Sequence, residues 1–337
     1  MYYLNRRSLL ARRPSGMPTN ECWKRDEVVI TSIQHNQILI KVEYLSIDPY
    51  MRGRMNEGVS YASPAKIDQP MTGETAGIVV ESKSNLYKVG DKVCIHQGWQ
   101  TYIVANDTDP SLTKIPSSSI PLSVYLGTLG MPGRTAYFGL NRVGKPKSGE
   151  TLVVSAASGA VGSVVGQLAK KYGCKVIGIA GGEEKCAYVK NVLNFDECID
   201  YKNSNLNESL KILCPNGIDI YFENVGGQVT RAVAPLLVKG ARVPVCGFIS
   251  QYNEKDMLAA ETPFDVLGSL KIKPAHRFFV VHEWIDEFEK ATTELSNMVL
   301  DGSLKYKETI TEGFENAPQA LRDVLSGKNF GKQLIKT

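Results

Sequence analysis

Hydrophobic and polar positions follow two different patterns along the chain, and the pattern changes near residue 126. Between residues 151 and 300, short apolar runs alternate with longer segments of helical periodicity. Repeated alternation of this kind predicts an α/β domain with a parallel, doubly wound sheet and right-handed crossovers. The expected strands are 151–155, 175–180, 198–200, 218–222, 241–246 and 278–281, and the expected helices are 159–172, 183–194, 206–213, 228–237 and 284–300.

The first part of the chain has short apolar runs separated by Gly, Pro, Asn and Asp turns. This pattern is typical of an antiparallel, barrel-like region. Its expected strands are 37–44, 77–80, 91–95 and 101–104, with further strand-like segments at 307–310 and 333–335. We therefore expect the tail to fold back onto the first domain. The expected domains are 1–125 with 302–337, and an inserted domain over 126–301.

The formal net charge of +4 arises from four arginines in the first thirteen residues, and the rest of the chain has 35 bases and 35 acids. A nucleic-acid-binding protein normally carries a basic stripe, so the balanced remainder argues against a nucleic-acid partner. The basic segment itself allows two interpretations. The first is a charged strand at the start of the domain, which the break at Pro14-Ser15-Gly16 favours. The second is an Arg-rich import presequence.

Two further features bear on the location of the protein. Residues 151–169 carry no charge, as in a membrane span, but their Ser, Thr, Gln and Gly residues indicate a buried strand, a turn and a packed helix, so we expect no membrane partner. The seven cysteines are scattered, without a CxxC pair or zinc spacing to histidine. This indicates reduced thiols and a cytoplasmic protein.

A glycine-rich turn joins the first strand and helix of the inserted domain, with the sequence Ser-Ala-Ala-Ser-Gly-Ala-Val-Gly over 155–162. Gly159 would let the backbone approach a pyrophosphate, whose charge meets the free amides at the helix start. Gly162 would permit close packing of helix and strand. In this strand–turn–helix context the motif predicts a dinucleotide site; the alternative is a glycine-rich turn in a sheet protein that binds none.

The next expected strand, 175–180, ends in two glycines rather than the acid that would accept hydrogen bonds from the ribose of NAD. Two glycines leave room for a 2′-phosphate, and Lys185 one helical turn later can neutralise it. This predicts NADPH as the cofactor. In the alternative interpretation, Glu183 or Glu184 turns inward to bind NAD while Lys185 is solvated.

Two more strand ends carry polar side chains. Asn224 follows the strand at 218–222 and is positioned either to bond a cofactor ribose or to form an Asx turn. The strand at 241–246 leads to Tyr252, which is thereby placed near the nicotinamide end of the crevice. For Tyr252 both packing and catalysis remain open at this point.

Several stretches of the chain carry a family resemblance, and Asp48-Pro49-Tyr50-Met51-Arg52 is the most specific of them. The stretches are 46–55, 129–137, 156–162, 223–227, 249–253 and 327–332. The sequence resembles the zinc-independent medium-chain dehydrogenase/reductases, in the branch of alkenal/one double-bond reductases that includes the prostaglandin, leukotriene and, most similar of all, curcumin reductases. The resemblance spans about residues 3–336. It implies a GroES-like, barrel-like catalytic domain, a Rossmann NADP-binding domain and a homodimer.

The resemblance also implies a metal-free site, since Ser46 and Glu74 stand where zinc-dependent relatives have their first Cys and His ligands. Tyr252, with Tyr50, would face the substrate carbonyl, and Lys185 and Tyr201 would bind the 2′-phosphate side. The other implied cofactor-binding residues are Met131 and Thr135 beside the nicotinamide, Gly159, Ala160, Val161 and Gly162 at the pyrophosphate, and Asn224, Cys246, Tyr252, Phe279, Val280, Val281 and Asn329.

The implied activity is NADPH-dependent reduction of the C=C bond of α,β-unsaturated ketones and aldehydes, with curcumin-like, prostaglandin-like or alkenal substrates. Hydride would go to the β-carbon, and Tyr252 would donate a hydrogen bond to the enolate oxygen. The enzymatic alternatives are a quinone reductase and a zinc-free alcohol dehydrogenase; the non-enzymatic one is an NADPH-binding regulatory or RNA-binding protein. Segment 253–262 departs from the family pattern, which leaves the physiological substrate open.

Overall fold

In a computed structural model of the protein, residues 2–58, 62–254 and 260–337 are described. The chain forms two compact units. Unit 1 comprises Met1–Gly127 and Glu308–Thr337, and unit 2 comprises Thr128–Lys307, so unit 2 is inserted in unit 1. The second boundary lies at 307/308, after the residue range expected from the sequence. Residues 255–259, inside the segment that departs from the family pattern, lie outside the described residues.

Unit 2 is built on a six-stranded sheet with the order β10-β9-β8-β11-β12-β13. All five pairings are parallel, which confirms the predicted doubly wound sheet. The strand order reverses between β8 and β11, the position at which such sheets bind ligands. The strands are β8 (Thr151–Ser155), β9 (Lys175–Ala180), β10 (Glu197–Asp200), β11 (Ile218–Phe222), β12 (Leu237–Val245) and β13 (Ala275–Phe278).

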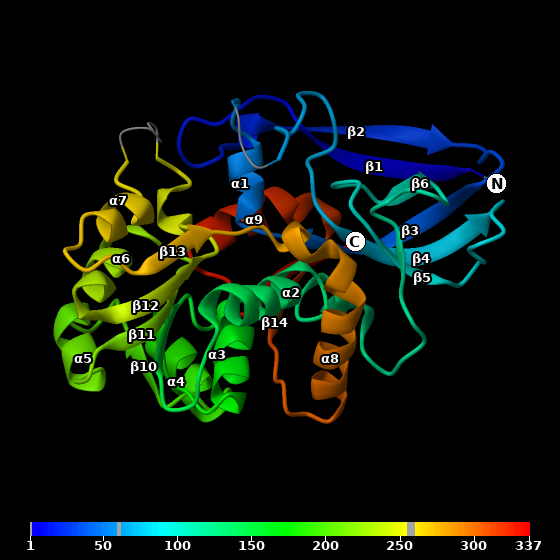
Figure 1. Cartoon of the computed structure of the whole chain (residues 1–337). Helices are drawn as coiled ribbons and strands as arrows, with labels where there is room; N and C mark the ends of the chain where they lie inside the picture. Colours follow the sequence, from blue (N-terminus) through cyan, green and yellow to red (C-terminus); the bar gives the residue numbers. More distant parts are fainter. Residues whose placement is uncertain (1, 59–61, 255–259) are drawn as a thin grey trace. The chain divides into compact units, whose positions relative to one another are not determined.

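Helices flank this sheet on both sides, with α5 and α6 on one side and α3 on the other (Figure 1). Cover on both faces explains why the strands read as continuous apolar runs. The helices are α2 (Met131–Phe138), α3 (Gly162–Lys171), α4 (Glu183–Asn191), α5 (Leu206–Leu213), α6 (Gly227–Val233), α7 (Pro263–Gly268) and α8 (Phe288–Leu300).

The last strand of unit 2 differs from the expected range 278–281. β13 ends at Phe278, because the next residues turn into a 3-10 segment, Val281–Glu287. The Glu283 carboxylate accepts a hydrogen bond of 2.8 Å from the amide of Val280 and so caps this turn. For the same reason α8 begins at Phe288 rather than at residue 284.

Unit 1 contains a seven-stranded sheet and a separate two-stranded pair, β1 with β2. The expectation of a purely antiparallel region is wrong at one edge, where β14 pairs with β15 in parallel. Parallel neighbours need a crossover, and helix α9 (Ala317–Leu325) supplies it. The other elements are β1 (Tyr3–Leu10), β2 (Trp23–Ile30), β3 (Gln37–Ile47), α1 (Tyr50–Arg54), β4 (Thr75–Ser82), β5 (Lys92–Ile95), β6 (Tyr102–Asn106), β7 (Thr113–Lys114), β14 (Glu308–Glu312) and β15 (Lys332–Lys336).

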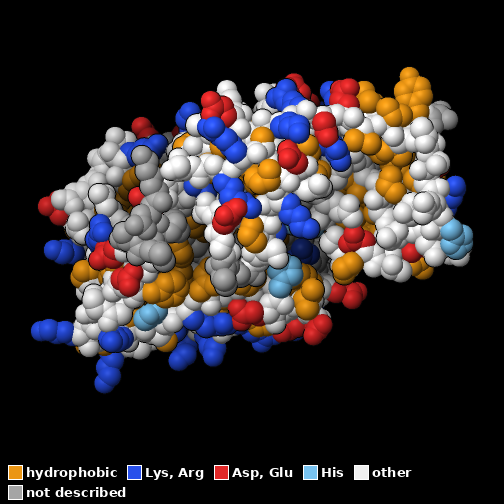
Figure 2. Space-filling view, turned by 90° about the horizontal axis from the view of Figure 1, so that it is seen from above, with side chains coloured by type: hydrophobic (Ala, Val, Ile, Leu, Met, Phe, Trp, Pro, Cys, Tyr) orange, Lys and Arg blue, Asp and Glu red, His pale blue; other side chains and the backbone are white. Residues whose placement is uncertain are grey.

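The basic N-terminal segment is part of the fold of unit 1. Tyr3–Leu10 forms strand β1, in register with β2. Three of its four arginines form ion pairs with acidic residues: Arg7 with Asp26, Arg12 with Glu21, and Arg13 with Glu57 at 2.9 Å. On the face shown in Figure 2, acidic and basic side chains are interspersed over most of the surface. Over the described residues, no helix is long and apolar enough to cross a membrane.

Candidate functional site

The loop between β8 and α3 has the geometry of a phosphate-binding turn. Ala156 adopts a left-handed conformation with φ of 52°, and the Gly159 amide donates to its carbonyl at 2.9 Å. A Cβ atom at Gly162 would lie 2.4 Å from the same carbonyl oxygen, so only glycine fits there. Val161, the N-cap of α3, provides no side-chain cap, and the amides of Ser163 and Val164 donate to the carbonyls of Gly159 and Val161. An anion would therefore meet the preceding amides of the turn, at the positive end of the helix dipole.

At the ends of β9 and β10, Asp200 joins two turns. Its Oδ1 atom accepts hydrogen bonds from the amide of Gly182 at 2.8 Å and from the amide of Lys202 at 3.1 Å. A Cβ atom at Gly181 would lie 2.9 Å from both the Tyr201 ring and Cε of Lys202. The glycine therefore makes room for these two side chains, and Tyr201 is 48% exposed.

Two lysines carry the positive charge in this region. Burial and the nearby charge of Lys202 lower the pKa of Lys185, while Glu184 acts in the opposite direction. Sequence reasoning identified Lys185 but missed Lys202, whose proximity depends on the turn that Asp200 holds. Each ammonium group disfavours the charged form of the other, and a dianionic phosphate would relieve this repulsion by accepting hydrogen bonds from both. The residues present therefore fit the 2′-phosphate of NADPH, and Glu183 and Glu184 are exposed.

The turn after β11 is organised around a fully buried carboxylate, Glu223, which is 0% exposed. Its Oε1 atom accepts from the amides of Val225 at 2.8 Å and Gly226 at 2.9 Å, and its Oε2 atom accepts from the hydroxyl of Thr230. Sequence reasoning gave Glu223 no role. An acid directly after a buried apolar strand was the available signal.

Asn224 is bonded to the end of β8. Its backbone amide donates to Ser155 Oγ at 2.9 Å, and its side-chain Nδ2 donates to the Ser155 carbonyl at 2.8 Å. The amide of Gly226, which an Asx turn at Asn224 would use, donates to Glu223 instead. Asn224 is thus a fixed polar group where the strand order reverses.

The segment after β12 is held against the Asn224 turn. The amides of Ile249 and Ser250 donate to the carbonyls of Asn224 and Val225, at 3.1 and 3.0 Å. A Cβ atom at Gly247 would lie 2.6 Å from the hydroxyl of Tyr252, so this phenol lies over the backbone at the carboxyl end of β12.

Cys246 immediately precedes that glycine. Burial, together with the charge of Glu223, raises the pKa of the Cys246 thiol to about 12. The thiol therefore stays protonated and is not a nucleophile at neutral pH.

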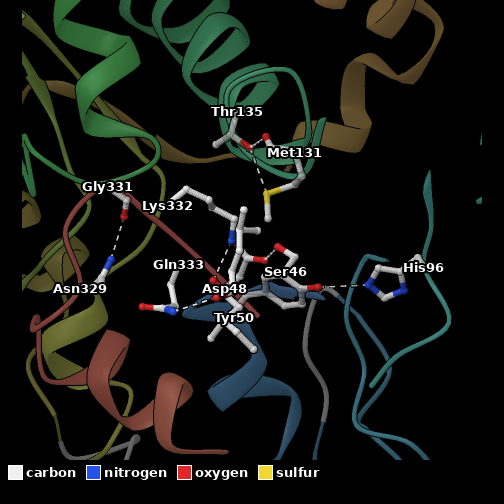
Figure 3. A network of polar contacts seen from close by, with 12 residues as sticks. Ser46, Asp48, Tyr50, His96, Met131, Thr135, Asn329, Gly331, Lys332 and Gln333 are labelled. Carbon is white, nitrogen blue, oxygen red and sulfur yellow. Dashed lines mark hydrogen bonds and ion pairs between the residues drawn. The ribbon is translucent and has the colours of Figure 1, made fainter. Parts of the chain in front are cut away.

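The remaining expected cofactor residues of unit 2 lie on α2 and after β13. The hydroxyl of Thr135 donates to the carbonyl of Met131 at 2.7 Å and contacts its sulfur at 3.5 Å (Figure 3). Phe279 and Val281 are 3% and 6% exposed, so their side chains belong mainly to the core, whereas Val280 between them is partly exposed.

In unit 1 the Asp48–Arg52 motif divides into buried and accessible parts. Asp48 forms an ion pair of 2.8 Å with Lys332, and both residues are 4% exposed. Arg52 is buried and donates to the carbonyl of Gly16 at 3.0 Å. Tyr50 is only partly buried, and its hydroxyl points to Nε2 of His96 at 3.1 Å (Figure 3).

Three other expected residues of unit 1 have local partners. Nδ2 of Asn329 donates to the carbonyl of Gly331 at 2.8 Å. Ser46 donates its hydroxyl to Asp48 and its amide to the carbonyl of Glu74, the latter at 2.9 Å. Within the described ranges, no group of three or more His, Cys, Asp or Glu side chains is arranged to hold a metal ion.

Comparison with known proteins identifies relatives over nearly the whole chain. Residues 6–115 match the family described as the N-terminal domain of oxidoreductase, and residues 160–296 match the zinc-binding dehydrogenase family. The chain is 45% identical to the putative NADP-dependent oxidoreductase YfmJ of Bacillus subtilis, over 97% of this chain and 96% of the relative. It is 44% identical to the NADPH-dependent curcumin reductase of Escherichia coli, over 98% and 96%.

A plant relative and a solved structure extend the comparison. The NADP-dependent 2-alkenal reductase of Nicotiana tabacum is 42% identical over 89% of this chain and 87% of its own. The crystal structure of CurA from Vibrio vulnificus in complex with NADPH superimposes with a TM-score of 0.92 at 43% identity, covering 98% of this chain and 99% of that one. Fold and site thus define a dinucleotide-dependent oxidoreductase. The chain belongs to the medium-chain dehydrogenase/reductases, in the NADP-dependent branch of the alkenal/one double-bond reductases.

Proposed function

We propose that the protein uses NADPH to reduce the C=C bond of α,β-unsaturated ketones and aldehydes. Relatives named as a curcumin reductase and a 2-alkenal reductase support this substrate class, because both names denote conjugated carbonyl compounds. Solved quinone oxidoreductases resemble the chain at 20% identity or less, a likeness that concerns the fold alone. We therefore retain a quinone reductase or a zinc-free alcohol dehydrogenase only as outcomes that product analysis can reveal.

The cofactor would be held by the ends of the strands of unit 2. Gly159, Ala160, Val161 and Gly162 would hold the pyrophosphate: the amide of Gly159 is bonded to Ala156, so this glycine would let the backbone approach, and the other three would offer their amides. Lys185 and Tyr201 would bind the 2′-phosphate, and we add Lys202 because it packs beside Gly181. The other groups on the cofactor side would be Met131, Thr135, Asn224, Cys246, Tyr252, Phe279, Val280, Val281 and, in unit 1, Asn329.

The chemical step needs stabilisation of negative charge on the substrate. When bound, NADPH supplies a hydride to the β-carbon. Charge then develops on the carbonyl oxygen, and a tyrosine hydroxyl, with an ordinary pKa of about 10, stays protonated and donates a hydrogen bond to it. We assign this donor to Tyr252, with Tyr50 as the second candidate. The α-carbon would take its proton from water.

One observation carries the assignment of Tyr252. Its hydroxyl lies over Gly247 at the carboxyl end of β12, and backbone hydrogen bonds fix its segment to the Asn224 turn. In doubly wound sheets this edge is where ligands bind. Tyr252 is thereby held by the same loops that we propose as the cofactor site.

Substitution of Tyr252 by Phe tests the mechanism. The kcat for 3-nonen-2-one should fall by roughly 10²-fold, because one donor to the developing oxyanion is lost. The KM for NADPH should stay nearly unchanged, and Tyr87→Phe, in the loop between β4 and β5, serves as a control with wild-type kcat. An unchanged kcat in Tyr252→Phe overturns the role of this hydroxyl. Allylic alcohol as the product, instead of saturated ketone, overturns C=C reduction itself.

We also propose that the protein acts in the cytoplasm as a homodimer, with small molecules and neither nucleic acid nor membrane as partners. The seven cysteines are free thiols in the structure, as a reducing compartment favours. The interspersed charges on the face shown in Figure 2 do not favour binding to nucleic acid, and so do not favour the RNA-binding alternative. The homodimer rests on the family resemblance.

A further inference from the structure

Two cysteines that the proposed reaction does not use lie in contact in unit 2. Cys186 is in the first part of α4 and Cys198 is in β10. Their Sγ atoms are 3.1 Å apart, and the Cys198 thiol donates to Cys186. A disulfide bond has an S–S length of about 2.05 Å, so closure requires a movement of only about 1 Å. Both cysteines, like Cys246, are partly exposed, whereas the other four cysteines are buried.

The two thiols differ in reactivity. The hydrogen bond from Cys198 lowers the pKa of Cys186, and this effect exceeds the opposing ones of burial and of the Asp200 charge. The same bond and burial raise the pKa of Cys198. Cys186 also lies near the N-terminus of α4, where the helix dipole favours a thiolate. A more acidic thiol beside a second one is the arrangement of an attacking and a resolving cysteine.

We propose that Cys186 and Cys198 form a redox modification site that a peroxide converts to an intramolecular disulfide. The Cys186 thiolate attacks one peroxide oxygen, the O–O bond breaks, and the products are a sulfenic acid and hydroxide, which takes up a proton to become water. Cys198 sulfur then attacks the sulfenic sulfur; the S–S bond forms, and the hydroxyl leaves as water with the Cys198 proton. In total two thiols are oxidised and one hydrogen peroxide is reduced to two waters.

The site adjoins the groups that we propose for the 2′-phosphate. Cys186 follows Lys185 directly, and Cys198 precedes Asp200 and Tyr201 in the same strand and turn. A disulfide would draw the first turn of α4 toward β10 and so shift Lys185 relative to Tyr201. This second step rests on the proposed function. We expect the oxidised protein to have a KM for NADPH raised by about tenfold, with kcat at saturating NADPH little changed.

The modification is tested on the reduced full-length protein, treated with hydrogen peroxide and then alkylated with N-ethylmaleimide. We expect peptide mapping to find a 186–198 cross-link, a mass loss of about 2 Da from the two hydrogens removed, and reversal by dithiothreitol. In Cys198→Ser, dimedone should trap a sulfenic acid on Cys186 without a cross-link. Alkylation of both cysteines after peroxide treatment, or pairing of either one with another cysteine, overturns the site.

The effect on the cofactor is tested by the KM for NADPH of the reduced, the oxidised and the peroxide-treated Cys198→Ser proteins. Only the oxidised wild type should show the increase. An equal increase in Cys198→Ser, or none in the cross-linked protein, overturns the coupling. The Lys185→Ala variant distinguishes a failure of the coupling from a failure of the proposed function. If Lys185→Ala also leaves the KM for NADPH unchanged, the assigned phosphate site itself is wrong.

Discussion

Two buried carboxylates, one in each unit, are stabilised by different kinds of partner. Asp48 in unit 1 pairs with the ammonium group of Lys332, which lies 284 positions away in the sequence. Glu223 in unit 2 is held by neutral donors, most of them within its own turn. The first carboxylate therefore joins distant segments of one sheet, β3 and β15, and the second shapes one short loop. We expect the ion pair to contribute mainly to the free energy of unfolding, and the Glu223 turn to contribute mainly to binding at the proposed cofactor site.

The largest effect is expected when the ion pair is broken from the lysine side. Lys332→Met would leave the Asp48 carboxylate buried without its countercharge, which costs about 3–5 kcal/mol in free energy of unfolding. Urea denaturation followed by tryptophan fluorescence measures this loss. Trp23 and Trp99 stack on each other in unit 1 at a centroid distance of 5.1 Å and report on that unit.

A double variant shows whether the pair itself or only its disruption matters. Asp48→Leu combined with Lys332→Met removes both charges, and buried pairs replaced by apolar groups often regain most of the lost stability. If the double variant regains the lost free energy of unfolding, the cost in Lys332→Met comes from the unbalanced charge of Asp48. If Lys332→Met unfolds at the same urea concentration as the wild type, the ion pair with Lys332 does not stabilise the fold.

A smaller effect is expected at Glu223. Glu223→Gln keeps the shape of the side chain, and its amide oxygen can still accept from the backbone amides of Val225 and Gly226. The new NH2 group then faces the hydroxyl of Thr230, which loses its acceptor, and the carboxylate charge is lost as well, at a cost of about 2 kcal/mol. Because the turn also positions Asn224, the KM for NADPH should rise, a result not expected for Lys332→Met. Steady-state kinetics and urea denaturation measure the two effects, with Glu208→Gln on exposed α5 as the control. A wild-type KM for NADPH in Glu223→Gln would show that the turn does not position the cofactor.

Much of unit 2 could be predicted because its determinants are local. Strands covered on both faces are apolar runs, so β8, β9 and β11 were predicted with their observed bounds. Gly159 and Gly162 were predicted because their turn has a recognisable sequence. The end of β13 was misplaced because hydrophobicity does not reveal the turn that follows it. That turn is capped by Glu283, five residues after the end of the strand.

The parts that sequence reasoning missed depend on residues distant in the chain. Ser155 and Glu223 are 68 positions apart, and no short motif links them. Lys202 lies close to Lys185, in the proposed phosphate site, because Asp200 holds two turns together. The Cys186–Cys198 contact joins a helix to a strand at a spacing that resembles no metal or redox motif. The parallel edge of unit 1 likewise follows from a crossover, α9, that the strand pattern alone does not show.

The smallest predicted effect concerns Lys185. Unlike the two carboxylates, it is a cation that lies near another cation, Lys202. Burial and the charge of Lys202 hold the pKa of Lys185 below its ordinary 10.5. A bound 2′-phosphate would favour the charged amine and raise this pKa. NADPH affinity should therefore be full below the pKa of the free protein and decrease as the pH rises through it. NADH lacks the 2′-phosphate, so its affinity should not follow this profile.

The ratio of KM values for NADH and NADPH, measured between about pH 7 and pH 10, tests this prediction. The ratio should fall toward high pH in the wild type. Lys185→Arg should flatten the profile, since a guanidinium stays protonated throughout. Lys185→Ala should lower the ratio by about tenfold near neutral pH, because one charge-assisted hydrogen bond to the phosphate is lost. Parallel profiles for the two cofactors would mean that Lys185 does not distinguish them. Glu223→Gln should instead weaken the binding of both cofactors alike, because in the proposed site its turn would contact the part that they share.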